Sequence, residues 1–266
     1  MRSLLLASVL RKLETLRSSG GEAAQHKFLI IGLPRSGTTY LMTLLNAHAR
    51  ISCEGEHYNP YAVIQGDHDD SHEAVVGRDS DPVGHMEQFF AQPQAAGVTH
   101  AGFKFMIGHN VRVLQQLEQM PDVTLIYVWR ENRLAQVSSL MRAARDKNWA
   151  ETEKQARKKR DPNLKIKANP RQISHRWHEY ATFDHLFRGW LAARPNPRFT
   201  VEYREMFQPG FKEKICAKLG LEVDPAMESP LVKQNPNTIA DRFAEPGPIR
   251  YYFKKIGYGG WLDDEL

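Results

Sequence analysis

Short apolar runs, several of them rich in β-branched residues, alternate along the chain with segments whose apolar residues recur at helical spacing. The apolar runs predict five buried strands, at residues 28–31, 50–53, 102–107, 123–129 and 199–203. Helical or polar segments separate these strands. Such an alternation is typical of an α/β fold, in which a central parallel sheet of about five strands is covered by helices.

Helical spacing predicts the covering helices. The segments concerned are 40–46, 86–91, 111–120, 133–146, 172–193 and 211–219. The last segment is followed by Gly220, which suits a helix C-terminus. Aromatic residues form a stripe along 172–193, and we interpret this stripe as core rather than as a ligand cage.

Three polar segments interrupt the pattern. Residues 65–84 predict an exposed loop, and the His–Asp cluster at 68–72 lacks the spacing of a metal site. Residues 154–171 are rich in basic side chains and predict either a solvated connection or a mobile basic lid near the acceptor site. The tail at 235–266 is rich in Pro and Gly and predicts mostly irregular chain. Its aromatic residues at 256–261 should fold over the domain, because a free tail would expose them.

The domain boundaries follow from the N-terminal segment. Residues 1–21 predict a leucine-rich helix that ends in a Ser–Gly joint, and residues 22–266 predict a single domain. The apolar run at 4–10 is too short to span a bilayer. Basic residues outnumber acidic ones in this helix, as they do in organelle-targeting peptides, so a targeting role stays open. A helix that packs on the domain is the favoured alternative.

Composition narrows the choice of partners and compartment only slightly. The chain has 266 residues and a formal net charge of +5, which favours an anionic ligand weakly. We expect no nucleic-acid partner and no transmembrane segment. Cys53 and Cys216, the only two cysteines, form neither a disulfide framework nor a zinc pattern. They favour a reducing compartment, and we expect a cytoplasmic location.

Candidate chemistry begins at the end of the first predicted strand. A phosphate-binding loop connects a strand to a helix through a glycine-rich turn. The same order occurs here, in strand 28–31, the loop from Gly32 to Gly37 and the helix that follows. In the nucleotide-triphosphate version of this loop, a lysine that reaches the β- and γ-phosphates would stand at Thr38. A loop without this lysine suits a ligand that has no γ-phosphate, and Arg35 can supply the positive charge.

The loop also resembles that of a known family. Its residues Pro34, Arg35, Ser36, Gly37, Thr38 and Thr39 resemble the 5′-phosphosulfate loop of sulfotransferases that use 3′-phosphoadenosine 5′-phosphosulfate (PAPS). Arg130 after the fourth strand and Ser138 in the next helix resemble the family's 3′-phosphate motif. An arginine in this position can grip a phosphate with a bidentate fork. The resemblance implies a P-loop-type three-layer domain that binds PAPS and releases 3′-phosphoadenosine 5′-phosphate (PAP).

Further matches extend the resemblance along the chain. Tyr203 stands where the family places a tyrosine near the adenine, and Lys254 and Lys255 faintly resemble a C-terminal segment that reaches the 3′-phosphate. Residues 55–56 and 102–104, together with the helix from Ser138 to Trp149, resemble bacterial carbohydrate sulfotransferases. That branch acts on trehalose or on nodulation factors, so the implied acceptor is a carbohydrate or glycolipid hydroxyl.

The resemblance also implies catalytic roles. Arg35 and the loop amides would hold the sulfate and the 5′-phosphate, and Lys104 would neutralise the bridging oxygen. Glu56 is similar in place to the catalytic glutamate of the trehalose branch, and it is the first candidate for the base that takes the acceptor proton. His109 is the second candidate, because the cytosolic branch uses a histidine after the third strand. We expect no metal, because arginine, lysine and loop amides replace it.

Two rival functions stay open at this stage. One is a P-loop kinase that uses ATP, against which Thr38 stands in place of the key lysine. The other is a non-catalytic protein that binds a phosphonucleotide on the same fold. The identity of the acceptor and the oligomeric state, a homo-oligomer included, cannot be read from the sequence.

Overall fold

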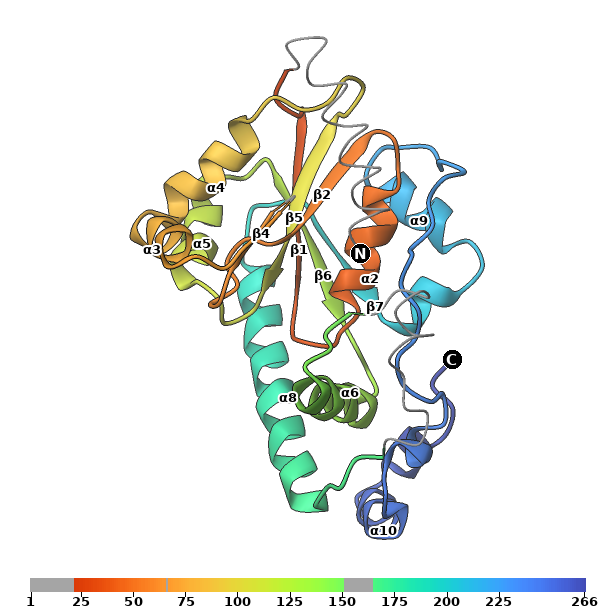
Figure 1. Cartoon of the computed structure of the whole chain (residues 1–266). Coiled ribbons are helices and arrows are strands. Elements are labelled where there is room, and N and C mark those ends of the chain that lie inside the picture. The colour runs from red at the N-terminus through yellow and green to blue at the C-terminus, as the bar shows by residue number, and fades with distance from the viewer. Residues whose placement is uncertain (1–21, 66, 151–164) are drawn as a thin grey trace.

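The computed structural model describes residues 22–65, 67–150 and 165–266. The predicted N-terminal helix with its joint, and most of the basic segment at 154–171, lie outside the described residues. The described part forms an α/β fold in which a central sheet is flanked by helices (Figure 1).

The sheet has five parallel strands in the order β2-β5-β1-β6-β7 within the described part of the chain, which confirms the predicted fold class. The strands are β1 (His26–Gly32), β2 (Ile51–Glu56), β5 (His100–Met106), β6 (Val123–Trp129) and β7 (Arg198–Glu202). β1 lies in the middle, so the chain must cross over it to pass from β5 to β6. The chain leaves β1 towards the β5 side of the sheet to reach β2, whereas it leaves β6 towards the opposite edge to reach β7.

Alternating side chains of β1 build two cores, one on each face of the sheet. Leu29 and Ile31 pack with α4 (Pro82–Ala91), α5 (Val111–Gln116) and the end of α8 (Pro170–Ala192). The alternate residues, Phe28 and Ile30, face the opposite side of the sheet.

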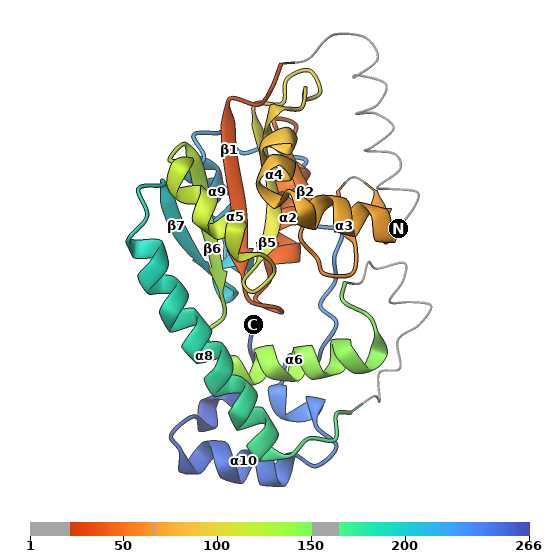
Figure 2. The ribbon, with the colours of Figure 1, turned by 90° about the vertical axis from the view of Figure 1, so that its left-hand side faces the viewer.

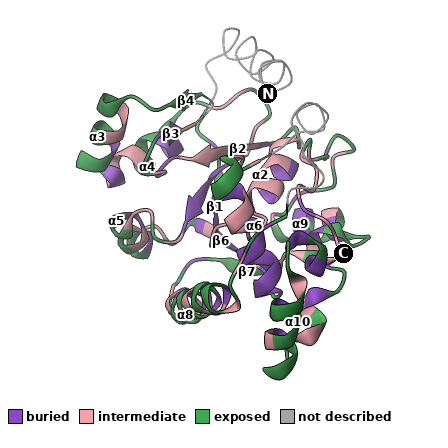
Figure 3. Ribbon diagram, turned by 60° about the horizontal axis from the view of Figure 1, so that its bottom comes forward, coloured by how far each residue is buried: buried purple, intermediate pink, exposed green. Residues whose placement is uncertain are grey.

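On that opposite face, Phe28 and Ile30 pack with α2 (Thr38–Asn46) and α9 (Phe211–Lys218). The strands are largely buried, whereas the outer faces of α8 and α10 are exposed (Figure 3). The alternation reflects the two-residue period of a strand, and it gives the three-layer arrangement.

A third core lies beyond the carboxyl ends of the strands, where α6 (Arg133–Asp146) runs across the molecule (Figure 2). The N-terminal half of α8, the helix α10 (Pro246–Lys255) and two short 3-10 helices, η3 (Ile239–Arg242) and η4 (Gly259–Leu262), complete it. This core closes the edge of the sheet at which ligands bind in α/β folds.

The tail prediction was right in part. The tail does fold over the domain, and Trp261 packs against Trp177 with ring centroids 5.2 Å apart. It is not mostly irregular, however, because it contains α10. A proline begins this helix, and Ile249 and Phe253, four residues apart, bury one face of it.

Most of the described residues in 65–84 are exposed as predicted, but the prediction that the segment is a loop was wrong. The segment contains strand β4 (His68–Asp69), which pairs with β3 (Val63–Ile64), and helix α3 (His72–Ser80). Ser71 caps α3 by accepting a hydrogen bond from an amide of its first turn, and Asp81 caps α4 in the same way. The segment has few apolar residues, so hydrophobic spacing could not reveal a helix that begins with a polar cap.

Elsewhere the predicted elements correspond closely to the observed ones. β6 and α6 have the predicted bounds, and Trp177, Tyr180 and Phe187 of the aromatic stripe are buried. Phe183 departs from the stripe, because 44% of it is exposed. No helix in the described residues is long and apolar enough to cross a membrane.

Candidate active site

The phosphate-binding loop leaves the central strand β1 and enters α2. Its position between β5 and β6 is the topological switch point of the sheet, where the strand order reverses. Gly37 precedes α2 with φ of 101°, and Arg35 has φ of 65°, so two residues of the loop adopt left-handed conformations. The first amides of α2 have no acceptors within the helix and can bind an anion.

Side chains of the neighbouring elements hold the outer side of the loop. Gln136 donates from Nε2 to the carbonyl of Pro34 at 2.8 Å, and Arg130 donates from Nη1 to the carbonyl of Arg35 at 2.9 Å. Ser36 Oγ is buried and has no hydrogen-bond partner among the described residues. A buried hydroxyl without a partner is costly, so a ligand oxygen would stabilise it.

Glycine is required where the loop approaches the rest of the site. A Cβ atom on Gly37 would lie 2.8 Å from the Tyr203 ring and 2.5 Å from the methyl group of Met206. The loop is therefore pressed against the segment that follows β7. This contact places the loop and Tyr203 in one cavity.

The side chain of Arg35 extends across this cavity. Its guanidinium donates from Nε to Ser139 Oγ at 2.9 Å and from Nη2 to Gln234 Oε1 at 2.7 Å. Nη1 donates to the backbone oxygen of Trp149. Burial and the charge of Arg130 lower the pKa of Arg35 to about 10, so the side chain still carries its charge at neutral pH.

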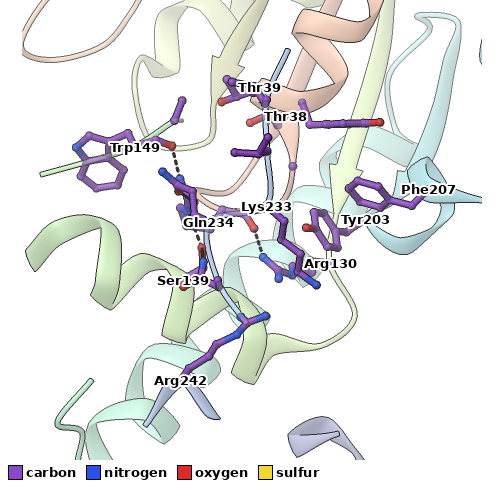
Figure 4. Close-up of a pocket in the computed structure, with 17 residues that line it drawn as sticks. Thr38, Thr39, Arg130, Ser139, Trp149, Tyr203, Phe207, Lys233, Gln234 and Arg242 are labelled. Carbon is purple, nitrogen blue, oxygen red and sulfur yellow. Dashed lines mark hydrogen bonds between the residues drawn. The ribbon is translucent and has the colours of Figure 1, made fainter. Parts of the chain in front are cut away.

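The cavity is bounded by four separate parts of the chain. Figure 4 shows Trp149 on one side and Tyr203 with Phe207 on the other. The described residues that line it are Arg35, Gly37, Thr38, Thr39, Tyr40, Arg130, Ser139, Trp149, Ala150, Tyr203, Phe207, Arg242 and residues 231–235. The cavity thus joins the predicted loop to Arg130 and Tyr203.

Arg130 follows β6 and lies at the floor of the cavity. Its guanidinium stacks on the Tyr203 ring, 4.1 Å from the ring centroid. Nε and Nη2 donate to the two carboxylate oxygens of Glu265, both at 2.6 Å. Arg242 and Lys233 approach the same carboxylate, at 3.1 and 3.7 Å. Glu265 is therefore bound at the fork that the sequence assigned to a phosphate.

The structure places Ser138 behind the cavity rather than in its wall. Ser138 Oγ donates to the carbonyl of Ala135 and accepts a hydrogen bond from Arg242 Nη1 at 3.2 Å. The next residue along α6, Ser139, faces the cavity instead. One step along a helix turns the side chain by about 100°. Ser138 can influence an anion at Arg130 only through Arg242.

Lys254 and Lys255 do not lie in the cavity wall either. Both are exposed residues in the last turn of α10. The helix that the tail forms carries them away from Arg130. Sequence reasoning missed the cations that do lie there, Lys233 and Arg242, because no motif or spacing marks them.

A second group of polar residues begins where β2 ends. Glu56 is the last residue of β2, and its carboxylate pairs with Lys104 Nζ at 2.7 Å and accepts from Asn59 Nδ2, also at 2.7 Å. Lys104 Nζ also donates to Thr39 Oγ1 at 2.8 Å. Because Thr39 lines the cavity, this chain of contacts connects Glu56 to it.

The electrostatics keep Glu56 ionised. Burial alone would raise the pKa of this carboxyl, but the charge of Lys104, with the hydrogen bonds from Lys104 and Asn59, lowers it below its ordinary value. His109 lies close enough for Glu56 to act on its pKa, which burial lowers. His109 is therefore neutral at physiological pH. Its Nδ1 is buried without a partner among the described residues. The two candidate bases belong to one cluster, beside the cavity rather than in its wall.

Comparisons with known proteins identify the family to which the chain is similar. A model described as "Sulfotransferase family" matches residues 28–225. Similar solved structures include a sulfotransferase from Alicyclobacillus acidocaldarius, at 16% identity and TM-score 0.46, over 91% of this chain and 98% of that chain. Mouse sulfotransferase SULT7A1, complexed with PAP, matches at 16% identity and TM-score 0.41, over 77% of this chain and 63% of that chain. Sulfotransferase STF9 from Mycobacterium avium matches at 14% identity and TM-score 0.42, over 98% of this chain and 82% of that chain. No curated protein sequence matches the chain.

Proposed function

The chain belongs to the sulfotransferase family, and on that premise we propose that it transfers a sulfuryl group from PAPS to a hydroxyl group of an acceptor. The observation that carries the proposal is the single cavity that joins a phosphate loop without its lysine to a second cluster of cations around Arg130. PAPS carries a 5′-phosphosulfate and a 3′-phosphate on one ribose. Two anion subsites within one cavity suit such a ligand.

The residues of the cavity fit PAPS in three respects. The amides of the loop would receive the 5′-phosphosulfate, whereas Ser36 is fully buried and does not line the cavity. Arg130, with Arg242, would bind the 3′-phosphate through charge-assisted hydrogen bonds. Tyr203 and Phe207, whose ring centroids lie 5.1 Å apart in an edge-to-face contact, would border the adenine. When bound, PAPS supplies the sulfuryl group and leaves as PAP.

The protein's own part in the reaction is to place charge and to accept a proton. Arg35 presents a guanidinium in the wall of the cavity, and Lys104 places an ammonium within hydrogen-bond distance of Thr39. Positive charge at these points would stabilise the charge that develops on the leaving oxygens. Glu56, which is ionised, would accept the proton of the acceptor hydroxyl as the new bond forms.

The contact between Lys104 and Thr39 argues against the rival kinase. Thr39 occupies the Ser/Thr position of the phosphate loop, where the hydroxyl of a nucleotide triphosphatase binds Mg²⁺. Here the hydroxyl of Thr39 accepts a hydrogen bond from an ammonium group at 2.8 Å. A fixed cation at this place would take over the electrostatic role of the metal.

For the acceptor we propose a carbohydrate or glycolipid hydroxyl. The support is the resemblance of residues 55–56 and 102–104 to the carbohydrate branch, together with a base supplied by a glutamate at the end of β2. The exposed ring of Trp149, 54% accessible at the mouth of the cavity, could stack on a sugar. The two cysteines are buried and form no disulfide in the described residues, which supports a reducing compartment such as the cytoplasm.

An acceptor screen tests the proposal. The protein is incubated with radiolabelled PAPS and a panel of free sugars, glycolipids, phenols and steroid alcohols, with Arg35→Ala as the inactive control. We expect transfer to a sugar hydroxyl. Transfer to phenols alone would disprove the carbohydrate assignment. Tight binding of PAP without transfer to any compound would favour the non-catalytic alternative.

A further inference from the structure

Glu265 lies at the centre of a buried cationic cluster. Its side chain is fully buried, and each carboxylate oxygen accepts a hydrogen bond from Arg130 at 2.6 Å. Arg242 Nη2 donates to it at 3.1 Å, and Lys233 Nζ lies 3.7 Å from it. Three cations thus surround one carboxylate, and the cluster keeps surplus positive charge while Glu265 is in place. Such a surplus suits a phosphate dianion.

Glu265 uses the edge of Arg130 that a phosphate would need. An arginine fork binds a carboxylate and a phosphate with similar bidentate geometry. Nη1 of Arg130 already donates to the backbone oxygen of Arg35, so the remaining bidentate edge is formed by Nε and Nη2. Glu265 takes both of these atoms. A phosphate brought to the same edge would meet a like charge, which is unfavourable in a buried site.

We propose that Glu265 is an internal anion that occupies the 3′-phosphate subsite of the empty enzyme and leaves Arg130 when a 3′-phosphorylated nucleotide binds. This inference rests on the proposed use of PAPS. It makes Glu265 a residue that sets how strongly the site prefers a nucleotide with a 3′-phosphate. Each binding event exchanges the carboxylate of Glu265 for the phosphate, so the arginines are not left unpaired at either stage.

The segment that carries Glu265 can move without disturbing the core. Leu262, at the end of η4, is 1% exposed and anchors the preceding chain in the third core. Beyond it, residues 263, 264 and 266 are exposed. The amide of Glu265 donates to the backbone oxygen of Asn237 at 3.3 Å, and the amide of Leu266 donates to Asn237 Oδ1 at 2.9 Å. Thr238 Oγ1 donates to Asp264 Oδ1. Release of Glu265 therefore requires the loss of a few polar contacts and no apolar packing.

Titration calorimetry with two nucleotides tests the exchange. PAP carries the 3′-phosphate, and adenosine 5′-phosphate lacks it. Glu265→Gln keeps the shape of the side chain but removes the competing charge. We expect this variant to bind PAP roughly tenfold to a hundredfold more tightly than the natural protein does, since hydrogen bonds to charged groups are strong. The affinity of the variant for adenosine 5′-phosphate should differ little from that of the natural protein.

Asp263→Asn is the matched control, because it removes one negative charge from an exposed position two residues away on the same segment. It should leave both affinities unchanged. An equal gain in PAP affinity for the two variants would show a general effect of charge, and the assignment of Glu265 would be wrong. An unchanged preference for PAP in Glu265→Gln would also overturn it.

Hydrogen exchange on the natural protein gives a second test, which does not depend on the folding of a variant. Saturating PAP should speed exchange at the amides of residues 263–266, whereas adenosine 5′-phosphate should not. Slower or unchanged exchange with bound PAP would mean that Glu265 stays in place. If neither the natural protein nor Glu265→Gln binds PAP more tightly than adenosine 5′-phosphate, the proposed use of PAPS fails, and this inference fails with it.

Discussion

At the scale of single residues, Glu56 and His109 differ in how they connect to the cavity. Lys104 and Asn59 hold Glu56 as an ionised carboxylate, while burial keeps His109 neutral. Glu56 also connects through Lys104 to Thr39 in the cavity. Both residues are thus in a form that can accept a proton, and the connection to Thr39 is what supports our proposal of Glu56 as the base.

The first prediction separates these two residues. Glu56→Gln keeps the size and hydrogen bonding of the side chain but cannot accept the proton, so kcat should fall by about 10²–10⁴-fold. Affinity for PAP should stay nearly constant, because Glu56 does not line the cavity. His109→Asn serves as the comparison and should lower kcat much less. Single-turnover sulfate transfer measures both. Normal transfer by Glu56→Gln with collapse in His109→Asn would assign the base to His109.

The second prediction concerns the pH dependence. The pKa of Glu56 lies below its ordinary value, because the effects of Lys104 and Asn59 outweigh that of burial. Without Lys104, burial would raise this pKa. A base must be ionised, so activity is lost as the pH falls through the pKa of Glu56. In Lys104→Met the acid limb of the kcat/KM profile should therefore move to higher pH, besides any loss of rate. An acid limb that does not move would show that Glu56 is not the group that titrates.

At the scale of elements, the junction of β1 with α2 depends on a glycine. Gly37 adopts φ of 101°, and any Cβ there would meet Met206 and the Tyr203 ring. Both the dihedral angle and the lack of space therefore demand glycine. The loop and the segment after β7 are held together by this close approach.

The third prediction follows from that approach. Gly37→Ala should destabilise the protein by about 1–3 kcal/mol and weaken PAP binding at least tenfold, because the loop must shift away from Tyr203. Gly220→Ala is the matched control, since Gly220 also has positive φ, at 70°, but has no neighbour within 4 Å of a built Cβ. The control should lose some stability and keep its affinity. Denaturant unfolding and calorimetry test the pair, and equal affinities for both variants would contradict the prediction.

At the scale of the whole molecule, the tail completes the third core. Phe253 of α10 is fully buried among residues of α6 and α8, whereas 68% of Tyr251, two residues earlier, is exposed. The tail therefore contributes to the stability of the fold as well as to the cavity.

The fourth prediction measures this contribution. Phe253→Ala should lower the free energy of unfolding by about 3–5 kcal/mol, the usual cost of deleting a buried phenylalanine. Tyr251→Ala on the same helix should change it by less than about 0.5 kcal/mol. Urea unfolding of both variants provides the measurement. Similar small losses in both would show that α10 does not pack on the domain in solution.

The fifth prediction concerns the ligand that stabilises the whole fold. PAP at a hundredfold excess over its dissociation constant should add about 2.7 kcal/mol, which raises the melting temperature by roughly 5–10 °C for a chain of this size. ATP with Mg²⁺ should do so much less, because Lys104 donates to the hydroxyl of Thr39, which a P-loop kinase would use to bind Mg²⁺. Thermal unfolding with each nucleotide decides the matter. An equal or larger shift with ATP and Mg²⁺ would favour the kinase.

The sequence by itself determined the elements whose pattern is local. The strand at 123–129 and the helix at 133–146 have the predicted bounds. The glycine loop from Gly32 to Gly37 was also recognised from the sequence. Strand period, helix period and glycine spacing all depend on residues that are close together in the chain. The helix at 72–80 was not predicted, because its main sequence signal is a polar cap and the segment has few apolar residues.

Only the tertiary structure decided what surrounds Arg130. Its partner Glu265 is 135 residues away. Lys233, which precedes the tail, and Arg242, which lies in the tail, approach the same carboxylate although no motif marks them. The rotation of α6 gives the cavity Ser139 in place of Ser138. Such contacts depend on how whole elements pack at the carboxyl edge of the sheet, where a side chain's partner is fixed by three-dimensional proximity and not by its spacing along the chain.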